Sequence, residues 1–507
     1  MNIYVIFFIA LIPIVWLMIS LVALKMPGHK TCPATLLITI ILAVIVWKMP
    51  LAQSITASLE GAAMAIWPIM LVIIAAVFTY NLSVYTKSMD IIKKMMTSIT
   101  TDKRILVLIL AWGFGGFLEA IAGFGTSVAI PASIMAALGF EPIFAAIICL
   151  IANTTPTAFG AIGLPVSTLA KITNIDVNTL SYAVGIQLTL LIIIVPIILV
   201  MLTGKSVKSI KGVFLISLAS GLSFAIPEVV AAKYLGAELP AILGSVICLV
   251  VTISIAKVFY KSSASKKVEK ISFKEGFLAW VPFILIFTFI IFTSSLFKPI
   301  SGALSNIQTS IQIYTGVSAK PYSFLWIANP GTLIIIATFI GGLIQGTSFK
   351  EIVNVFINTI RQMSKSTITI VSILALAKVM GYSGMVKSIA VVLVSGTGKF
   401  YPVIAPLIGA LGTFVTGSDT SANVLFGGLQ VEMAKSLGLN PYWLAAANTG
   451  GATAGKMISP QSIAVATAAT GLAGKEGKIL NSTLKFCVAY VVVLGLFAYF
   501  MAPVFGF

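Results

Sequence analysis

The feature that most constrains the fold of this 507-residue chain is its series of long apolar segments. A stretch of about 20 apolar residues can cross a bilayer as a helix. The chain is 59% hydrophobic and 9% charged, with a mean hydropathy of +1.09, whereas soluble domains carry about 25% charged residues. The segments are longer than the alternating strands of a membrane barrel. We therefore predict an all-α polytopic membrane protein embedded in the lipid bilayer. The predicted spans are about 3–24, 31–48, 55–80, 181–203, 213–232, 239–259, 277–297, 326–345, 366–382 and 481–505.

The distribution of lysines predicts the topology. The net charge of +18 lies mostly in short loops, as the positive-inside rule expects of cytoplasmic loops, so it does not indicate nucleic-acid binding. Lys-rich and Lys-poor loops alternate if both termini lie outside the cell membrane and the 260–276 loop is cytosolic. This alternation allows residues 105–170 to cross only once. We predict a re-entrant hairpin at 105–138 and an interrupted helix at 141–170. The same argument gives a hairpin at 402–436 and an interrupted helix at 441–472, for about 12 transmembrane helices plus two re-entrant hairpins.

Two short motifs recur in the same order in both halves of the chain. "GTSVAIP" at 125–131 aligns with "SDTSANV" at 418–424, and "ANTTPTAFGAIGLPVS" at 152–167 aligns with "ANTGGATAGKMISPQS" at 447–462, at nearly the same offset. The two hairpins enter from opposite sides, which predicts inverted-topology repeats of the kind found in secondary transporters. The alternative is that the small residues only mediate tight helix packing. The predicted parts are an N-terminal helix at 1–30, repeat 1 at 31–203, linking helices at 204–325 and repeat 2 at 326–505.

Polar residues gather at the predicted hairpin tips and helix breaks. A broken helix offers free N–H groups and a positive dipole end to a small carboxylate, and neutral side chains can bind a neighbouring hydroxyl. We therefore predict a substrate site for a small anion. Its candidate residues are Thr126, Ser127, Asn153, Thr154, Ser418, Thr420, Ser421, Asn448, Thr449 and the cation Lys456.

Four charged residues lie in these apolar regions, where a charge indicates function by default. Asp419 and Glu119 are candidates for proton coupling, because desolvation favours a protonated carboxyl. Two alternatives are that Asp419 and Lys456 only neutralise each other and that Glu119 caps a helix. Lys171 is expected to extend from a helix end toward water. The four cysteines show no CxxC spacing and are expected to be small core residues, and the sequence predicts no catalytic residue, metal site or cofactor.

The motifs resemble the lactate permease family of bacterial carriers along nearly the whole chain. The resemblance rests on "GFGGFLEAIAGFGTSVAIPASIMAALGF", "ANTTPTAFGAIGLPV", "TGSDTSAN" and "NTGGATAGKMISPQSIAVA". It implies proton symport of L-lactate, with D-lactate and glycolate as related substrates. The motifs are also similar to a wider ion-transporter superfamily with scaffold and transport domains, whose Ser-Asn-Thr triplets hold carboxylate and sodium. The triplets here read Ala-Asn-Thr, which puts sodium coordination in doubt. A sodium-coupled carrier of small carboxylates, an anion channel and assembly into a homo-oligomer stay open.

Overall fold

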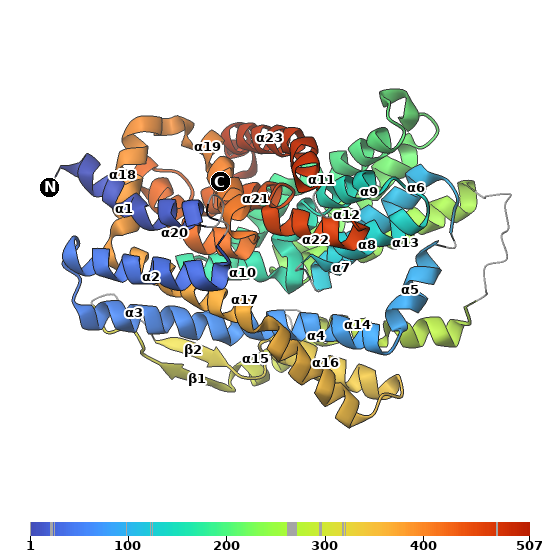
Figure 1. Cartoon of the computed structure of the whole chain (residues 1–507), viewed down its shortest axis with the longest axis horizontal. Helices are drawn as coiled ribbons and strands as arrows, with labels where there is room; N and C mark the ends of the chain where they lie inside the picture. Colours follow the sequence, from blue (N-terminus) through green and yellow to red (C-terminus); the bar gives the residue numbers. More distant parts are fainter. Residues whose placement is uncertain are drawn as a thin grey trace.

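The computed structural model of the protein describes residues 2–20, 24, 26–97, 99–121, 123, 125–260, 271–293, 297–316, 319, 321–472 and 475–507. Its helices form two layers that lie one above the other in Figure 1. Most of the predicted 260–276 loop falls outside the described residues. The hairpins and interrupted helices all belong to the upper layer of the figure, which we call the hairpin layer. The layer below it is called the support layer.

The support layer contains the early helices of both halves and a small antiparallel sheet in which Gln308 pairs with Leu325. Its elements are α2 (Gly28–Ile45), α3 (Leu51–Met64), η2 (Ala65–Met70), α4 (Leu71–Tyr85), α5 (Ser88–Thr97), α14 (Phe273–Thr293), α15 (Lys298–Ser305), β1 (Gln308–Ile311), β2 (Tyr322–Leu325), α16 (Pro330–Ile344) and α17 (Phe349–Ser383).

The hairpin layer contains the remaining helices, with α1 (Ile3–Met18), α18 (Met385–Thr397) and η7 (Gly398–Phe400) at one end. Its elements are α6 (Lys103–Val107), η3 (Leu108–Phe114), α7 (Gly115–Ile121), α8 (Thr126–Ala137), α9 (Pro142–Ala152), η4 (Thr155–Phe159), α10 (Gly160–Thr173), α11 (Val177–Thr203), η5 (Val207–Ile210), α12 (Phe214–Tyr234), α13 (Pro240–Phe259), α19 (Tyr401–Thr416), α20 (Asp419–Leu437), α21 (Pro441–Lys456), α22 (Pro460–Thr470), α23 (Glu476–Met501) and η8 (Pro503–Phe505).

The helices confirm a polytopic all-α membrane protein. Among the described residues, ten helices are long and apolar enough to span a bilayer, or eleven if the bent pair 142–152 and 155–173 counts as one span. Each predicted span overlaps one of the observed helices. The predicted spans 326–345 and 366–382 leave a Lys-rich segment, 350–365, between them as a cytosolic loop. This prediction is wrong, because the segment belongs to the 35-residue helix α17. Ser348 and Glu351 form a capping box that begins this helix well before its apolar part.

Local chemistry explains where the hairpins turn. In the first half, α7 ends at Ile121 and α8 begins at Thr126, and the connection passes through Gly125 at a φ of +85°. A side chain is disfavoured in this left-handed region, so glycine suits the turn. In the second half, Gly417 ends α19 in the same region, and Ser418 caps α20 by accepting a hydrogen bond from the Ser421 N–H.

Both interrupted helices break near the middle of the hairpin layer. In the first half, α9 ends at Ala152 with Asn153 as its C-cap, and Ala161 and Ile162 have positive φ angles of 43° and 58°. Such angles are rare for a β-branched residue and mark local strain. In the second half the break is shorter: α21 ends at Lys456, and Ser459 caps α22.

Helices that the sequence repeat equates contact partners in an exchanged manner. Helix α8 packs on α22 and α20 packs on α10, while α9 packs on α23 and α21 packs on α11. The same exchange occurs around the support layer, where α17 packs on α2 and α4 packs on α16. The segments joined by these contacts lie close together in Figure 1. The hairpins and breaks of both halves are therefore brought to one region.

Candidate functional site

A polar cavity of about 370 Å³ lies where the hairpin tips and helix breaks face the support layer. One wall comes from residues of α2 and α17, including Ser366 and Thr369. The opposite wall comes from both hairpins and both interrupted helices. We call it the central cavity. Its remaining polar side chains are Glu119, Thr157, Thr416, Ser418, Asp419, Thr420, Ser421, Lys456, Gln461 and Ser462.

A buried ion pair joins the two halves of the chain at this cavity. Lys456 Nζ lies 2.5 Å from Glu119 Oε1, and the two side chains are 11% and 3% exposed. The other carboxylate oxygen of Glu119 accepts a hydrogen bond of 2.5 Å from Ser127 Oγ. Lys456 therefore pairs directly with Glu119, and among the described residues no ion pair joins it to Asp419. Contact between these residues requires the first hairpin to meet the second interrupted helix, which the exchanged helix packing provides.

The space for the Glu119 carboxylate depends on a glycine, Gly160, at the break in the first interrupted helix. A Cβ atom on Gly160 would lie 2.7 Å from Glu119 Oε1, which is closer than such atoms approach in proteins. Glycine at this position therefore leaves the space that the carboxylate occupies.

The carboxylate of Asp419 ends a chain of buried hydrogen bonds. Gln430 Nε2 donates to Asn448 Oδ1, and Asn448 Nδ2 donates to Asn423 Oδ1, each at 3.0 Å. Asn423 Nδ2 then donates to Thr449 Oγ1 at 2.6 Å, and Thr449 Oγ1 donates to Asp419 Oδ1 at 3.0 Å. Asp419 Oδ2 is buried and has no hydrogen-bond partner among the residues that the structure describes. Because an unpaired buried carboxylate oxygen is costly as an anion, this atom is a place where a proton can be held.

The predicted site residues fall into two groups. Six of them line the central cavity: Glu119, Ser418, Asp419, Thr420, Ser421 and Lys456. The other six lie behind it and support the wall. Ser127 and Thr449 contact the two carboxylates, Asn448 belongs to the hydrogen-bond chain, and the hydroxyls of Thr126 and Thr154 bind the backbone carbonyls of Gly123 and Ile151. Asn153 is buried, and within the described part of the chain neither polar atom of its side chain forms a hydrogen bond.

Sequence reasoning did not single out Asn423 and Gln430, which complete the hydrogen-bond chain. Both are fully buried amides on α20. Asn423 follows Asp419 by four residues, so a helix starting at the hairpin tip places both on one face. That spacing is the signal that could have identified it. The support-layer residues of the cavity carry no comparable signal.

The arrangement is suited to a small anion. Helices α20 and α22 both begin at the cavity wall, and the first turns of helices carry partial positive charge. Lys456 adds a full positive charge that Glu119 balances. The hydroxyls of Ser418, Thr420 and Ser421 supply neutral donors and acceptors.

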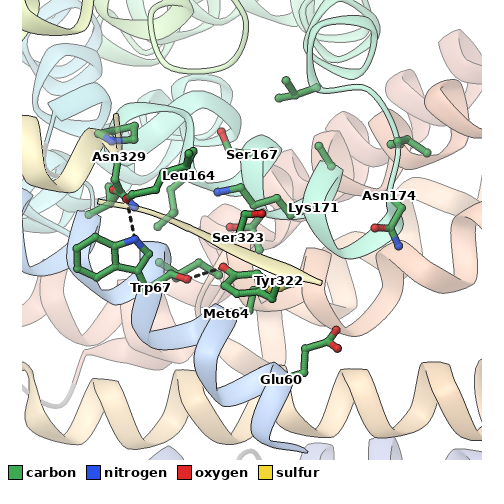
Figure 2. Close-up of a pocket in the computed structure, with 18 of the residues that line it drawn as sticks. Glu60, Met64, Trp67, Leu164, Ser167, Lys171, Asn174, Tyr322, Ser323 and Asn329 are labelled. Atoms are coloured by element: carbon green, nitrogen blue, oxygen red, sulfur yellow. Dashed lines mark hydrogen bonds between the residues drawn. The ribbon is translucent and has the colours of Figure 1, made fainter. Parts of the chain in front are cut away.

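A second cavity of about 770 Å³ lies between the same two layers. Figure 2 shows Lys171 and Ser167 of α10 facing Tyr322 and Ser323 of β2 across it. Leu164 lines both cavities, so it stands where they adjoin. Lys171, which was expected only to extend toward water, lines this cavity with an exposed side chain.

Broken helices that meet around a cavity with polar side chains in a polytopic helical protein are typical of membrane transport proteins. The sequence profile of the L-lactate permease family matches residues 6–505. The chain belongs to this family.

Several relatives align with most of the chain. The L-lactate permease of Streptococcus iniae is 56% identical over 439 residues, covering 86% of this chain and 93% of that protein. The glycolate permease GlcA of Escherichia coli is 36% identical and covers 98% of this chain and 96% of its own length. Among solved structures, MtrF of Neisseria gonorrhoeae has a TM-score of 0.52 at 14% identity, over 92% of this chain and 94% of that chain. This likeness concerns the fold alone.

Proposed function

We propose that this protein is a secondary carrier that moves L-lactate, with D-lactate and glycolate as related substrates, across the cell membrane by proton symport. The names of its relatives support a small 2-hydroxy monocarboxylate as the substrate. The dimensions and polarity of the central cavity suit such a molecule, which needs a cation for its carboxylate and neutral groups for its hydroxyl.

The buried pair between Glu119 and Lys456 carries the proposal of proton coupling. While Glu119 is ionised, it forms an ion pair with Lys456, and a substrate carboxylate has to compete with Glu119 for the ammonium group. When Glu119 takes up a proton, Lys456 becomes available to the substrate. Binding of the anion and binding of the proton then favour each other, which is the thermodynamic requirement for symport.

The remaining residues have supporting roles in this proposal. Ser418, Thr420 and Ser421 bind the substrate directly, while Thr126, Ser127, Asn153, Thr154, Asn448 and Thr449 hold the tips and breaks in place. The unpaired oxygen of Asp419 is the second candidate for the proton. Its hydrogen-bond chain fixes it beside the site, and it interacts with Lys456 only through space, because Lys456 pairs directly with Glu119.

We also propose that the two halves are inverted repeats and that the hairpin layer moves as a transport domain against the support layer. The exchanged contacts between α8 and α22 and between α20 and α10 support a two-fold relation between the halves. The position of the central cavity between the two layers supports movement at that boundary. The alternation of lysines supports termini outside the cell.

Uptake of labelled L-lactate into proteoliposomes tests this function. A pH gradient, acid outside, is expected to drive accumulation above the external concentration, and a sodium gradient alone is not. Accumulation that follows sodium would instead establish a sodium-coupled carrier. Flux that no ion gradient drives uphill would establish a channel. Competition by D-lactate, glycolate and other short acids ranks the substrates.

A further inference from the structure

The second cavity contains one cation that the structure leaves without a direct partner. Five charged residues line this cavity: Glu60, Lys171, Asp176, Glu238 and Lys378. Their contacts show which charges are already balanced within the described part of the chain. The balance decides whether the cavity can attract an ion.

Glu60 and Lys378 balance each other within the support layer. Lys378 Nζ lies 2.8 Å from Glu60 Oε1, and the hydroxyl of Tyr382 donates to the same oxygen at 2.8 Å. The two charged side chains are 5% and 10% exposed. This pair is enclosed and leaves no net charge for a ligand.

Asp176 is engaged as the cap of α11. Its Oδ1 accepts hydrogen bonds from the backbone N–H and the hydroxyl of Thr179, at 2.8 and 2.7 Å. These bonds lower the pKa of the Asp176 carboxyl. Its charge is therefore held at the helix start, where it is stabilised by the dipole.

Lys171 and Glu238 remain. Within the described residues Lys171 forms no hydrogen bond and no ion pair, and its interaction with Glu238 is electrostatic at longer range. Figure 2 shows its side chain extending into the cavity near Ser167 and Ser323. Burial raises the pKa of the Glu238 carboxyl, and the charge of Lys171 partly offsets this rise.

We propose that Lys171 forms a second anion site, which receives the carboxylate of the substrate on its way between the water and the central cavity. The proposal rests on the function proposed above. The second cavity adjoins the central cavity at Leu164, which lines both. The Leu164 side chain therefore stands between an anion held at Lys171 and the central cavity, where Lys456 lies. The cavity walls include residues 174–177, 238, 321–323 and 325. These residues lie in the segments 171–180, 233–238 and 298–325, which the alternation of Lys-rich and Lys-poor loops predicts to face outward.

Both anion sites share one design. In each, a lysine on an interrupted helix faces a cavity and has a glutamate as its internal counter-charge, Glu119 for Lys456 and Glu238 for Lys171. The looser pairing at Lys171 suits a site that captures an anion and releases it again. A carboxylate that enters this cavity can bind Lys171 without first breaking an ion pair between Lys171 and Glu238.

The test compares L-lactate flux in the two directions for Lys171→Gln, in membrane vesicles of both orientations at low ionic strength. The KM from the side of the second cavity is expected to rise about three- to tenfold, because capture by a charge mainly affects association. The KM from the opposite side is expected to stay unchanged, while the maximal rate of flux toward the second cavity falls by the same factor, because at equilibrium the fluxes in the two directions must balance. Lys171→Arg retains the cation and is expected to restore most of the effect.

Lys233→Gln is the matched control. Lys233 is also exposed near the end of α12 but does not line the cavity, and its ammonium lies over the rings of Tyr182 and Tyr234. Its loss is expected to leave both KM values unchanged. Glu238→Gln removes the counter-charge and is expected to lower the KM from the same side, which a purely structural role of Lys171 does not explain.

An unchanged KM in Lys171→Gln, or an equal rise in Lys233→Gln, overturns the proposal. So does an equal rise of KM from both sides. The assay reads the KM of lactate flux whichever ion drives it. A failure of proton coupling therefore shows in the accumulation experiment, while a failure of the second anion site shows only here.

Discussion

Replacing Glu119 by glutamine is the perturbation that examines the coupling mechanism most sharply. Glutamine keeps the shape of the side chain and can still accept from Ser127, but it cannot neutralise Lys456. The pair is nearly enclosed, with exposed fractions of 3% and 11%, so solvent screens it weakly. Removing one partner of a buried pair leaves a charge whose cost is about 3–5 kcal/mol.

A substrate carboxylate that enters the cavity recovers much of this cost. Using about 3 kcal/mol, Glu119→Gln is expected to bind L-lactate roughly 100-fold more tightly than the wild-type protein at alkaline pH. The wild-type KM is expected to rise about tenfold per pH unit where the Glu119 proton has to be taken up from solution. The variant has no proton to take up, so its KM is expected to be independent of pH.

Counterflow of labelled L-lactate in proteoliposomes, measured between about pH 6 and about pH 9, reports both effects. The variant is expected to exchange lactate but to lose accumulation driven by a pH gradient. Glu432→Gln is a matched control, because Glu432 lies on α20 away from the cavity and pairs with Lys435 at 3.1 Å. A KM in Glu119→Gln that rises with pH as in the wild type would refute the reasoning.

Other predictions concern the rest of the site. Lys456→Gln is expected to raise the KM for L-lactate by about 10- to 100-fold, the value of a charge-assisted hydrogen bond, and Lys456→Arg less; equal KM values in all three proteins, measured by uptake, would contradict the role of the cation. Asp419→Asn is expected to retain pH-driven accumulation with a KM within about threefold of the wild type, because Asp419 does not compete for Lys456; loss of accumulation would assign the proton to Asp419. Asn423→Ala is expected to destabilise the protein by about 1–3 kcal/mol, because it leaves buried partners unsatisfied, and an unchanged unfolding midpoint in detergent would argue against the hydrogen-bond chain. Gly160→Ala is expected to lower uptake through overpacking of about 1–3 kcal/mol against Glu119, whereas Gly302→Ala, where a Cβ meets nothing within 4 Å, is expected to leave uptake unchanged.

The sequence predicts where helices exist and where they break, because both depend on local chemistry. Gly125 and Gly417 stand at the hairpin turns, and Ser418 and Ser459 begin the helices that follow. The division of the chain into repeats and domains stays a prediction. The start of α17 was missed because its lysines were interpreted as a loop, although Ser348 and Glu351 signal a helix start.

The pairing of charges could not be predicted from local patterns. Lys456 and Glu119 are 337 residues apart in the chain. The acid in the hairpin motif of the second half, which also contains Lys456, is Asp419. Which acid reaches the lysine depends on how the hairpins pack, and Gly160 opens that space only in the folded protein. Asn423 differs, because its four-residue spacing from Asp419 can be seen in the sequence. Only its hydrogen-bond partner on α21 cannot be seen there.

Proton uptake on substrate binding tests the central claim most directly. Purified protein in weak buffer at mildly alkaline pH is mixed with saturating L-lactate, and a pH indicator records the protons taken from solution. We predict about one proton per bound lactate for the wild type and for Asp419→Asn, and close to none for Glu119→Gln, because one carboxylate exchanges its place beside Lys456 for another. Lactate binding without proton uptake in the wild type, or undiminished uptake in Glu119→Gln, would contradict the account.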